Sequence, residues 1–320
     1  MNRSRVVKAL ALHGLIVALL FAAQFVVSDY NQLTLTRIMV LAVFAVGYNL
    51  LFGYTGLLSL GHALFFGAGL YGAGLAAYHL EASVPLAFLA GVGASLAVAL
   101  VIGLISLRTR GVSFMIVTMM FAQAGFLALL YFNTWTGGDQ GLTLPAAARS
   151  FAVGGLTVDL ADPVVRYNLA VILLALALAL VLLVVMRPGG RVLVAIRENE
   201  ARTQMLGYDT FAHKLKAFVL SGGLSGASGA AYALMFAYVG SSFASIHYSI
   251  QALLFTLLGG AGTVLGPVLG TILMFYLIDK ASDVTSAYLL VVGFVLIGLI
   301  LWFPRGILGT IRERWVRWLP

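Results

Sequence analysis

Nine long apolar runs separated by short polar segments dominate this chain of 320 residues. Most contain about 17–25 residues, which as α-helix suffices to cross the roughly 30 Å hydrocarbon core of a bilayer. Strands of a membrane barrel would alternate apolar and polar residues, whereas these runs are apolar on all sides. An all-α, polytopic transmembrane bundle is therefore predicted, with runs near 10–28, 36–53, 62–80, 85–106, 112–132, 166–186, 215–239, 251–278 and 287–303.

Composition excludes the soluble classes. Hydrophobic residues make up 62% of the chain and charged residues 9%, against about 25% charged residues in a typical soluble domain. Cysteine is absent, which excludes a disulfide framework, a thiolate nucleophile and cysteine-ligated metal. The net charge of +8 needs no nucleic acid partner, because membrane proteins collect Lys and Arg on their cytoplasmic side.

The basic residues also set the expected orientation. They cluster before the first run, between the fourth and fifth runs, between the sixth and seventh runs, and in the C-terminal tail. We therefore expect both termini in the cytoplasm and about eight full crossings. The opposite loops carry acidic residues, namely Asp29, Glu81, Asp139, Asp159, Asp162, Asp279 and Asp283.

This orientation requires the run over 251–278 to make no net crossing. Its 28 residues are too few for two crossings, so we predict a re-entrant pair of half-helices. Backbone of this kind is tolerated at membrane depth only where protein or a water-filled cavity covers it. One long kinked helix is the alternative, and it would place the basic tail outside. The interrupting residues are Gly259, Gly260, Gly262, Gly266, Pro267 and Gly270.

The first run follows Arg3, Arg5 and Lys8 and has features of a signal peptide. It is longer than the usual apolar region of 7–15 residues, so we expect a first span.

A weak internal repeat is also present. Glycines follow Leu50-Leu51-Phe52 and again Leu253-Leu254-Phe255, and paired glycine-interrupted segments point to a transport pathway. Ordinary glycine in membrane helices is the alternative.

No catalytic arrangement is present, and we expect no enzyme activity, cofactor or metal site. His13 and His62 are the clear ionisable residues inside the runs, with Arg37 at a run end. Two interpretations of His62 stay open, a pathway or gating residue and a helix-end histidine bonded to backbone. No Walker A motif occurs. Leu220-Ser221-Gly222-Gly223 lies inside an apolar run, where small residues four apart predict close helix packing.

The basic segment 187–216 is the most informative loop. Apolar residues recur in it at helical spacing, and Gly207 is suited to end a helix. We predict a short amphipathic helix or helix pair. Its apolar side would be either a solvated loop face or, as we favour, a docking surface for a partner. That side comprises Val192, Ala195, Ile196, Ala201, Met205 and Leu206.

This loop resembles the coupling loop of permease subunits of branched-chain amino-acid ABC transporters. The match lies in Ala195-Ile196-Arg197-Glu198-Asn199-Glu200-Ala201, followed by Gly207. Further matches are Leu58 to Gly67, Gly111 to Thr118, Thr136-Gly137-Gly138 with Gly141-Leu142, Leu258 to Pro267, and Phe303-Pro304-Arg305-Gly306. The pattern looks like the LivM-type subunit rather than its LivH-type partner. It departs from the broader coupling motif at Arg202, and Asp139-Gln140 stands where Ser-Asp is expected.

The resemblance implies the permease half of an ATP-driven importer for branched-chain or hydrophobic amino acids. It implies a second homologous permease, two ATPase subunits, an extracytoplasmic solute-binding protein and a bacterial inner membrane. Close relatives of the family import urea, short amides or aromatic acids. An ion-coupled secondary carrier and a channel or scaffold are the rival classes, and the few charges inside the runs weigh against the carrier.

The resemblance also implies roles for particular residues. Coupling to the ATPase would fall to Arg197, Glu198, Asn199, Glu200, Ala201, Leu206 and Gly207. The pathway or its gates would include Gly56, Ser59, Gly61, His62, Gly259, Gly260, Gly262, Thr263, Gly266 and Pro267. The binding protein would contact Gly137, Gly138, Asp139 and Gly141 in the outer loop 133–165.

The expected organisation has three parts. Residues 1–35 form an N-terminal tail and first span, and 36–310 form the permease domain with its coupling loop at 187–216. Residues 311–320 form a tail whose mixed Arg and Trp residues suit an interfacial helix held by lipid headgroups. Contact with an ATPase is the alternative for that tail.

Overall fold

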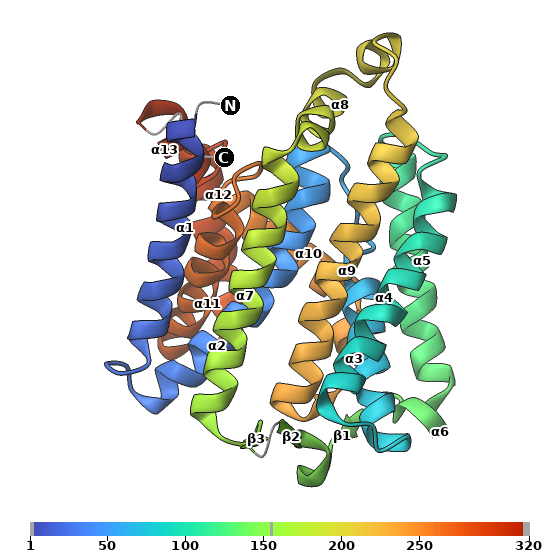
Figure 1. Cartoon of the computed structure of the whole chain (residues 1–320), viewed down its shortest axis with the longest axis vertical. Coiled ribbons are helices and arrows are strands. Elements are labelled where there is room, and N and C mark those ends of the chain that lie inside the picture. The colour runs from blue at the N-terminus through green and yellow to red at the C-terminus, as the bar shows by residue number, and fades with distance from the viewer. Residues whose placement is uncertain (1–2, 154–155, 316–320) are drawn as a thin grey trace.

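The computed structural model describes residues 3–153 and 156–315 as a bundle of long helices (Figure 1). The predicted helical fold is confirmed. Within these described residues, five helices are long and apolar enough to cross a membrane, namely α2 with its extension to Tyr54, α4, α5, α7 and α9. The principal helices are α1 (Arg3–Ala23), α2 (Asp29–Asn49), α3 (His62–His79), α4 (Val84–Ser106), α5 (Val112–Tyr131), α7 (Pro163–Met186), α9 (Thr210–Phe236), α10 (Ile246–Gly259), α11 (Gly266–Val284) and α12 (Tyr288–Trp302).

Shorter elements lie at the two ends of the bundle (Figure 1). A π-helical turn, Leu50–Tyr54, continues α2. The strands β2 and β3 form an antiparallel hairpin that pairs Ser150 with Asp159, and β1 pairs with β4. The short elements are α6 (Asn133–Thr136), β1 (Leu142–Thr143), β2 (Ser150–Val153), β3 (Leu156–Asp159), α8 (Pro188–Met205), β4 (Tyr238–Val239), α13 (Ile307–Arg314) and the 3₁₀ turns Ala146–Arg149 and Ser241–Ala244.

Helices α2 and α9 form the centre of the bundle. Small residues on α9 let its neighbours approach closely. Gly222 faces Ala99 of α4, and Gly226 faces Ser95 of α4 and Gly69 of α3. The predicted small-residue packing face is therefore confirmed, and Leu220-Ser221-Gly222-Gly223 is part of a buried helix.

The start of α1 and the helix α13 lie at the same end of the bundle as α8, and we name this the α8 end (Figure 1). The four strands and α6 lie at the opposite end, which we name the strand end. Helix α1 contacts the bundle through Tyr167, whose hydroxyl donates to the carbonyl of Leu20 at 2.6 Å. An even number of passes through the bundle agrees with this arrangement.

The segment 251–278 folds into two helices that run antiparallel side by side. Cβ atoms built on Gly259 and Gly270 would collide with backbone of the opposing helix, so the two backbones touch. The segment is therefore divided into two helices, as predicted, and is not one kinked helix. Its re-entrant insertion stays a prediction. Helix α11 is longer than a half-helix, at 19 residues. The apolar pattern hid this because α11 continues through the charged residues Asp279 and Lys280.

Candidate functional site

Helix α8 carries the predicted coupling segment and bends at Asn199. This residue has φ −161° and ψ 100°, outside the helical region. Its side-chain oxygen accepts a hydrogen bond from the backbone N–H of Arg202 at 2.9 Å and so caps a second short helix. The helix pair allowed by the sequence is thus present within α8.

The bend separates two kinds of apolar residue. Before it, Val192 and Ile196 are buried against the bundle. After it, Met205 and Leu206 are 87% and 70% exposed. Gly207 ends the helix with φ +86°, a conformation that glycine adopts without steric cost. The predicted apolar side is therefore divided, and its second part forms an exposed tip.

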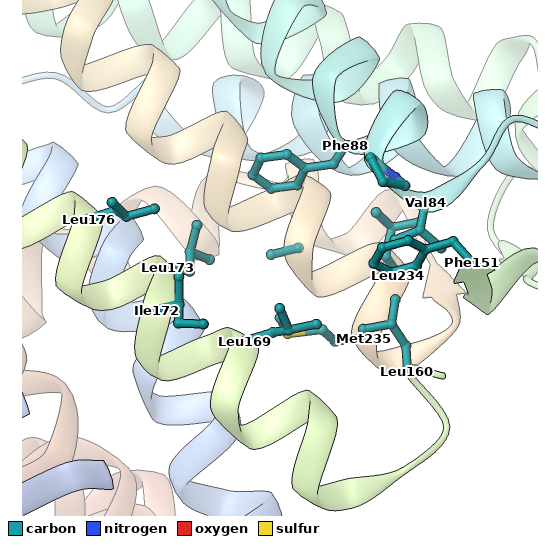
Figure 2. Close-up of a pocket in the computed structure, with 12 residues that line it drawn as sticks. Val84, Phe88, Phe151, Leu160, Leu169, Ile172, Leu173, Leu176, Leu234 and Met235 are labelled. Atoms are coloured by element: carbon teal, nitrogen blue, oxygen red, sulfur yellow. The ribbon is translucent and has the colours of Figure 1, made fainter. Parts of the chain in front are cut away.

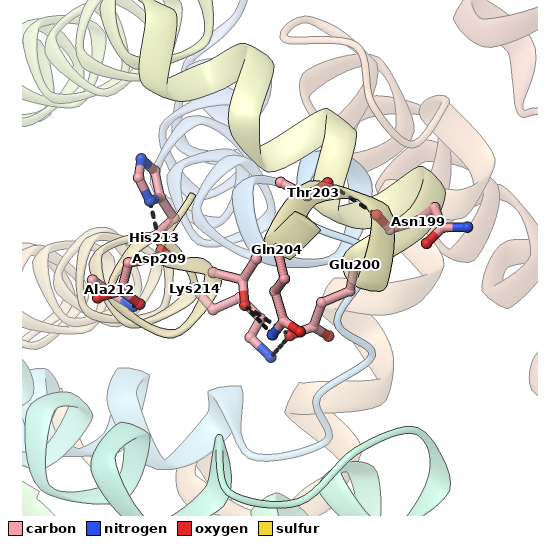
Figure 3. Close-up of polar contacts among 9 residues, drawn as sticks. Asn199, Glu200, Thr203, Gln204, Asp209, Ala212, His213 and Lys214 are labelled. Atoms are coloured by element: carbon pink, nitrogen blue, oxygen red, sulfur yellow. Dashed lines mark hydrogen bonds and ion pairs between the residues drawn. The ribbon is translucent and has the colours of Figure 1, made fainter. Parts of the chain in front are cut away.

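Glu200 ties this tip to the first turn of α9 (Figure 3). Its carboxylate accepts from Lys214 Nζ at 2.6 Å and from the Thr210 hydroxyl at 3.1 Å. Gln204 in turn donates to the Thr210 hydroxyl at 2.8 Å. Burial opposes ionisation of Glu200, but the hydrogen bond and charge of Lys214 outweigh it and hold the pKa of Glu200 below its usual value.

Arg197 joins α8 to the end of α2. Its Nη1 donates to the carbonyl of Gly53 at 2.6 Å, and its Nη2 pairs with Glu198 at 2.8 Å. Gly56, with φ +75°, lies directly against the Arg197 side chain, where a Cβ would collide. Arg197, Glu198 and Glu200 are thus paired within this chain, whereas Ala201 is exposed.

Asn49 connects the end of α2 to the turn between α10 and α11. Its amide donates to the carbonyl of Thr263 and its oxygen accepts from the N–H of Gly262, both at 2.9 Å. Arg312 of α13 donates to the carbonyl of Gly262 at 2.6 Å. The two glycine-rich segments that the sequence singled out therefore meet at one place, together with α8 and α13. We name this place, defined by Asn49, Gly53, Arg197, Gly262 and Arg312, the junction.

Glycine is required in this turn for two reasons. Gly260 and Gly262 have φ +125° and +75°. A Cβ on Gly259 would collide with the carbonyl of Gly266, and a Cβ on Gly266 would collide with the carbonyl of Gly260. Thr263 donates to the carbonyl of Gly260 at 2.8 Å, and Pro267 occupies the first turn of α11. A cavity of about 770 Å³ opens beside the turn, between Phe52, Arg197, Thr263 and Arg312.

His62, Ser59 and Gly61 lie apart from the junction, deeper in the bundle. His62 is fully buried, and its Nε2 is 2.7 Å from the hydroxyl of Ser221, which donates to the carbonyl of Gly47 at 2.6 Å. Since the Ser221 proton goes to Gly47, we assign the proton of His62 to Nε2. The ring stands at the start of α3, as the sequence allowed, but it bonds a serine rather than backbone.

The chain enters α3 as non-helical backbone, over residues 55–61. Side-chain hydroxyls satisfy its N–H groups. Thr118 accepts from Leu60, Ser59 accepts from Gly61, and Ser249 of α10 accepts from Ala63. Buried backbone that is not helical needs such partners. This irregular passage between α2 and α3 is the kind of segment expected along a transport pathway.

The predicted contact loop for the binding protein is a tight turn at the strand end. Gly137, Gly138 and Gly141 all have positive φ. Gly141 lies against the backbone of Val239, so these glycines shape the turn, while Asp139 is exposed.

In the C-terminal tail, α13 contacts the junction through Arg312, and Arg305 pairs with Glu313. The remainder of the expected tail helix, residues 316–318, lies outside the described residues.

Sequence reasoning missed Asn49, Ser221 and Arg312. Asn49 and Ser221 are polar residues inside apolar runs, which was a usable signal, because a buried polar group needs a partner. Their partners lie 214 and 159 residues away. No local pattern indicates such contacts.

Known proteins were compared with the chain as a whole. Residues 31–301 match the family described as branched-chain amino acid transport system / permease component. The chain is 28% identical over 312 residues to the high-affinity branched-chain amino acid transport system permease protein LivM of Salmonella typhimurium, covering 91% of this chain and 72% of that protein. The corresponding LivM protein of Escherichia coli is 27% identical over 324 residues, covering 93% and 75%. No solved structure matches.

The family match covers both glycine-rich segments and α8, which carry the resemblance seen in the sequence. It confirms that resemblance and indicates a multi-pass membrane protein. The chain belongs to the branched-chain amino acid transport system permease family.

Proposed function

We propose that this chain is one of two permease subunits in an ATP-driven importer for branched-chain or other hydrophobic amino acids. Two ATPase subunits, a homologous permease and an extracytoplasmic binding protein complete the assembly. The family and its LivM relatives support this proposal. ATP hydrolysis takes place in the partner ATPases, and this chain supplies half of the pathway by alternating access in a bacterial inner membrane.

The junction is the single observation that carries the mechanism. An exposed apolar tip, Met205 and Leu206, stands at one end of α8. At the other side of the bend, Arg197 holds the carbonyl of Gly53, and Asn49 holds the α10–α11 turn. A displacement of the tip by an ATPase is therefore transmitted to α2, α10 and α11 through hydrogen bonds rather than through flexible loop.

We place the α8 end in the cytoplasm and the strand end outside. The ATPase then docks on the tip and on Ala201, and the binding protein docks near Asp139. Helices α1 to α5, α7 and α9 to α12 make ten passes, which keeps both termini on one side. Ser59, Gly61 and His62 lie along the pathway at mid-bundle, and the turn from Gly259 to Pro267 gates its cytoplasmic end.

Uptake by the reconstituted five-component transporter tests the coupling role of the tip. Replacing Met205 and Leu206 together by Glu should abolish ATP-dependent uptake, because charged side chains remove the apolar docking surface. The double swap Met205→Leu with Leu206→Met conserves volume and should transport normally. Normal uptake by the Glu variant at normal expression and insertion would refute the coupling assignment.

Affinity purification of the tagged chain from its native membrane, read by mass spectrometry, tests the assembly. Two ATPases and a second permease should co-purify. Ligand screening of the partner binding protein then identifies the substrate, and leucine, isoleucine and valine are expected to stabilise that protein. Stabilisation by urea or a short amide instead would keep the transporter class and overturn the substrate.

A further inference from the structure

A groove with apolar walls opens between α7 and α9 near the strand end (Figure 2). These two helices are held together mainly through α2, and the space between them is about 230 Å³. Its lining includes Phe88 of α4, Leu169 and Leu173 of α7, and Leu234 and Met235 of α9. Ile172 and Leu176 stand 52% and 64% exposed at its side, so the groove opens laterally.

Two arginines are anchored to the backbone of residues that line this groove. Arg149 donates to the carbonyls of Leu160 and Met235 at 3.0 and 3.1 Å. Arg166 donates to the same Met235 carbonyl at 3.3 Å. Leu160 and Met235 themselves line the groove. The two like charges therefore converge on the same groove-lining backbone.

A third guanidinium adds to this positive charge. The ring of Phe236 has Arg37 at 5.4 Å and Arg166 at 5.8 Å from its centre. The nearby carboxylates accept hydrogen bonds from backbone N–H groups. Asp159 accepts from Ala161, and Asp162 caps α7 by accepting from Val164. Asp162 acts on Arg166 at a distance. Among the described residues, no carboxylate is recorded in an ion pair with any of these three arginines.

Guanidinium groups that lie close together repel each other, and an anion bound between them offsets this repulsion. Arg149 also leaves its Nε buried without a hydrogen-bond partner in the structure. Arginine guanidinium groups bind phosphate oxygens in a bidentate manner. The apolar groove beside them runs along α7 from Leu169 to Leu176, about 10 Å of helix.

We propose that this groove is a binding site for an anionic phospholipid. One acyl chain fills the groove between α7 and α9, and the headgroup phosphate is bound by Arg149 and Arg166, with Arg37 adding attraction. The shape and the charge point to the same ligand. A segment of a partner protein would have to combine an acidic group with an extended apolar chain in the same geometry.

Photo-crosslinking of the assembled transporter tests the site. The probe is phosphatidylglycerol with a diazirine in its acyl chain, in vesicles otherwise made of phosphatidylcholine. Crosslinks should be enriched on the groove residues of α4, α7 and α9. The double variant Arg149→Gln with Arg166→Gln should lower this labelling about 25-fold, at about fivefold for each basic residue near an anionic headgroup. Arg108→Gln, an exposed arginine at the α8 end, should leave it unchanged.

A second variant separates the groove from the folding of the arginine loop. Ile172→Trp fills the mouth of the groove and should abolish the α7 and α9 crosslinks, whereas Leu290→Trp on the exposed face of α12 should not. Labelling spread evenly over the exposed faces of α1 and α12 would overturn the proposal. The proposal would also be overturned if neither the arginine variant nor the Trp variant changed the labelling. It would likewise be overturned if the second permease covered the groove in the assembled transporter.

Discussion

At the residue scale, Asn49 shows how one polar side chain can hold two distant segments. It is fully buried, and it satisfies one donor and one acceptor of the α10–α11 turn. The turn has no helical or strand partner for these groups. The Asn49 side chain therefore supplies the hydrogen-bond donor and the acceptor that a neighbouring helix or strand would otherwise provide.

Replacement of Asn49 by Leu should destabilise the protein by about 2–6 kcal/mol, because two buried backbone groups lose their partners and each costs about 1–3 kcal/mol. Thermal unfolding of the purified chain in detergent measures this. Asn168→Leu is the matched control, since Asn168 is partly exposed and bonds one carbonyl within its own helix, and it should change stability by less than about 1 kcal/mol. Equal effects of the two changes would show that the Asn49 bridge is not important.

The Glu200–Lys214 pair gives a second residue-scale prediction. The Lys214 side chain is only 5% exposed, so Glu200→Gln leaves a buried ammonium with a neutral partner and should cost about 1–3 kcal/mol. Glu198→Gln breaks a pair whose carboxylate is 68% exposed and should cost about 0–1 kcal/mol.

The same pair predicts a pH dependence. The pKa of Glu200 is lower in the folded protein than that of an ordinary exposed glutamate, so its contribution to stability is complete above that ordinary pKa. It is lost as the pH falls through the folded pKa. Melting curves between pH 3 and pH 6 should therefore converge for the wild type and Glu200→Gln at the acid end. A constant gap across this range would contradict the assignment.

At the element scale, the sequence located most helices but not their irregular connections. The run 62–80 became α3 over His62–His79, and 85–106 became α4 over Val84–Ser106. The length of an apolar run is enough to predict a helix of this kind. Helix α9 begins at Thr210, earlier than the run 215–239, because the side chain of Asp209 caps it by accepting from the N–H of Ala212. The charged Lys214, which lies before the run, is buried as the partner of Glu200. The two-residue ladder of β1 and β4 depends on contact between distant segments, which no local pattern reveals.

The candidate site was also predicted only in part, because contacts between distant segments leave no local pattern. Glycine spacing indicated both glycine-rich segments, since glycine at unusual φ or at a close approach leaves a clear trace in the sequence. That Gly53 and Gly262 lie together was not predicted. It follows from Asn49 and Arg197, whose hydrogen bonds span the middle of the chain.

The α10–α11 hairpin offers a test at this scale. Gly259→Ala places a methyl group against the carbonyl of Gly266, so the helices must separate, and we expect a loss of about 1–3 kcal/mol or more. Gly293→Ala in α12 meets open space and should be neutral or stabilising by up to about 1 kcal/mol. Melting temperature and monodispersity in detergent give the comparison. If Gly259→Ala melted as high as Gly293→Ala, the close approach would be wrong.

At the scale of the whole molecule, charge and fold agree on one arrangement. Most Lys and Arg residues lie in the loops of the α8 end, as expected of a cytoplasmic face. The strand end carries the acidic loops, Arg37 and Arg166 at the Phe236 ring, and Arg149 at the carbonyl of Met235. With the α10–α11 turn at the α8 end, we propose ten passes in place of the eight crossings and re-entrant segment predicted from the sequence, with both termini on one side.

The absence of cysteine makes this topology directly testable, because single cysteines can be introduced without background. With the α8 end in the cytoplasm, Asp139→Cys and Asp283→Cys should react with an impermeant maleimide added outside intact cells. Met205→Cys and Ala261→Cys should react only after the membrane is opened. Ala261 is decisive, because it lies in the α10–α11 turn. Labelling of Ala261→Cys from outside, with Met205→Cys protected, would restore a hairpin inserted from the outer face, and labelling of Met205→Cys from outside would invert the whole bundle.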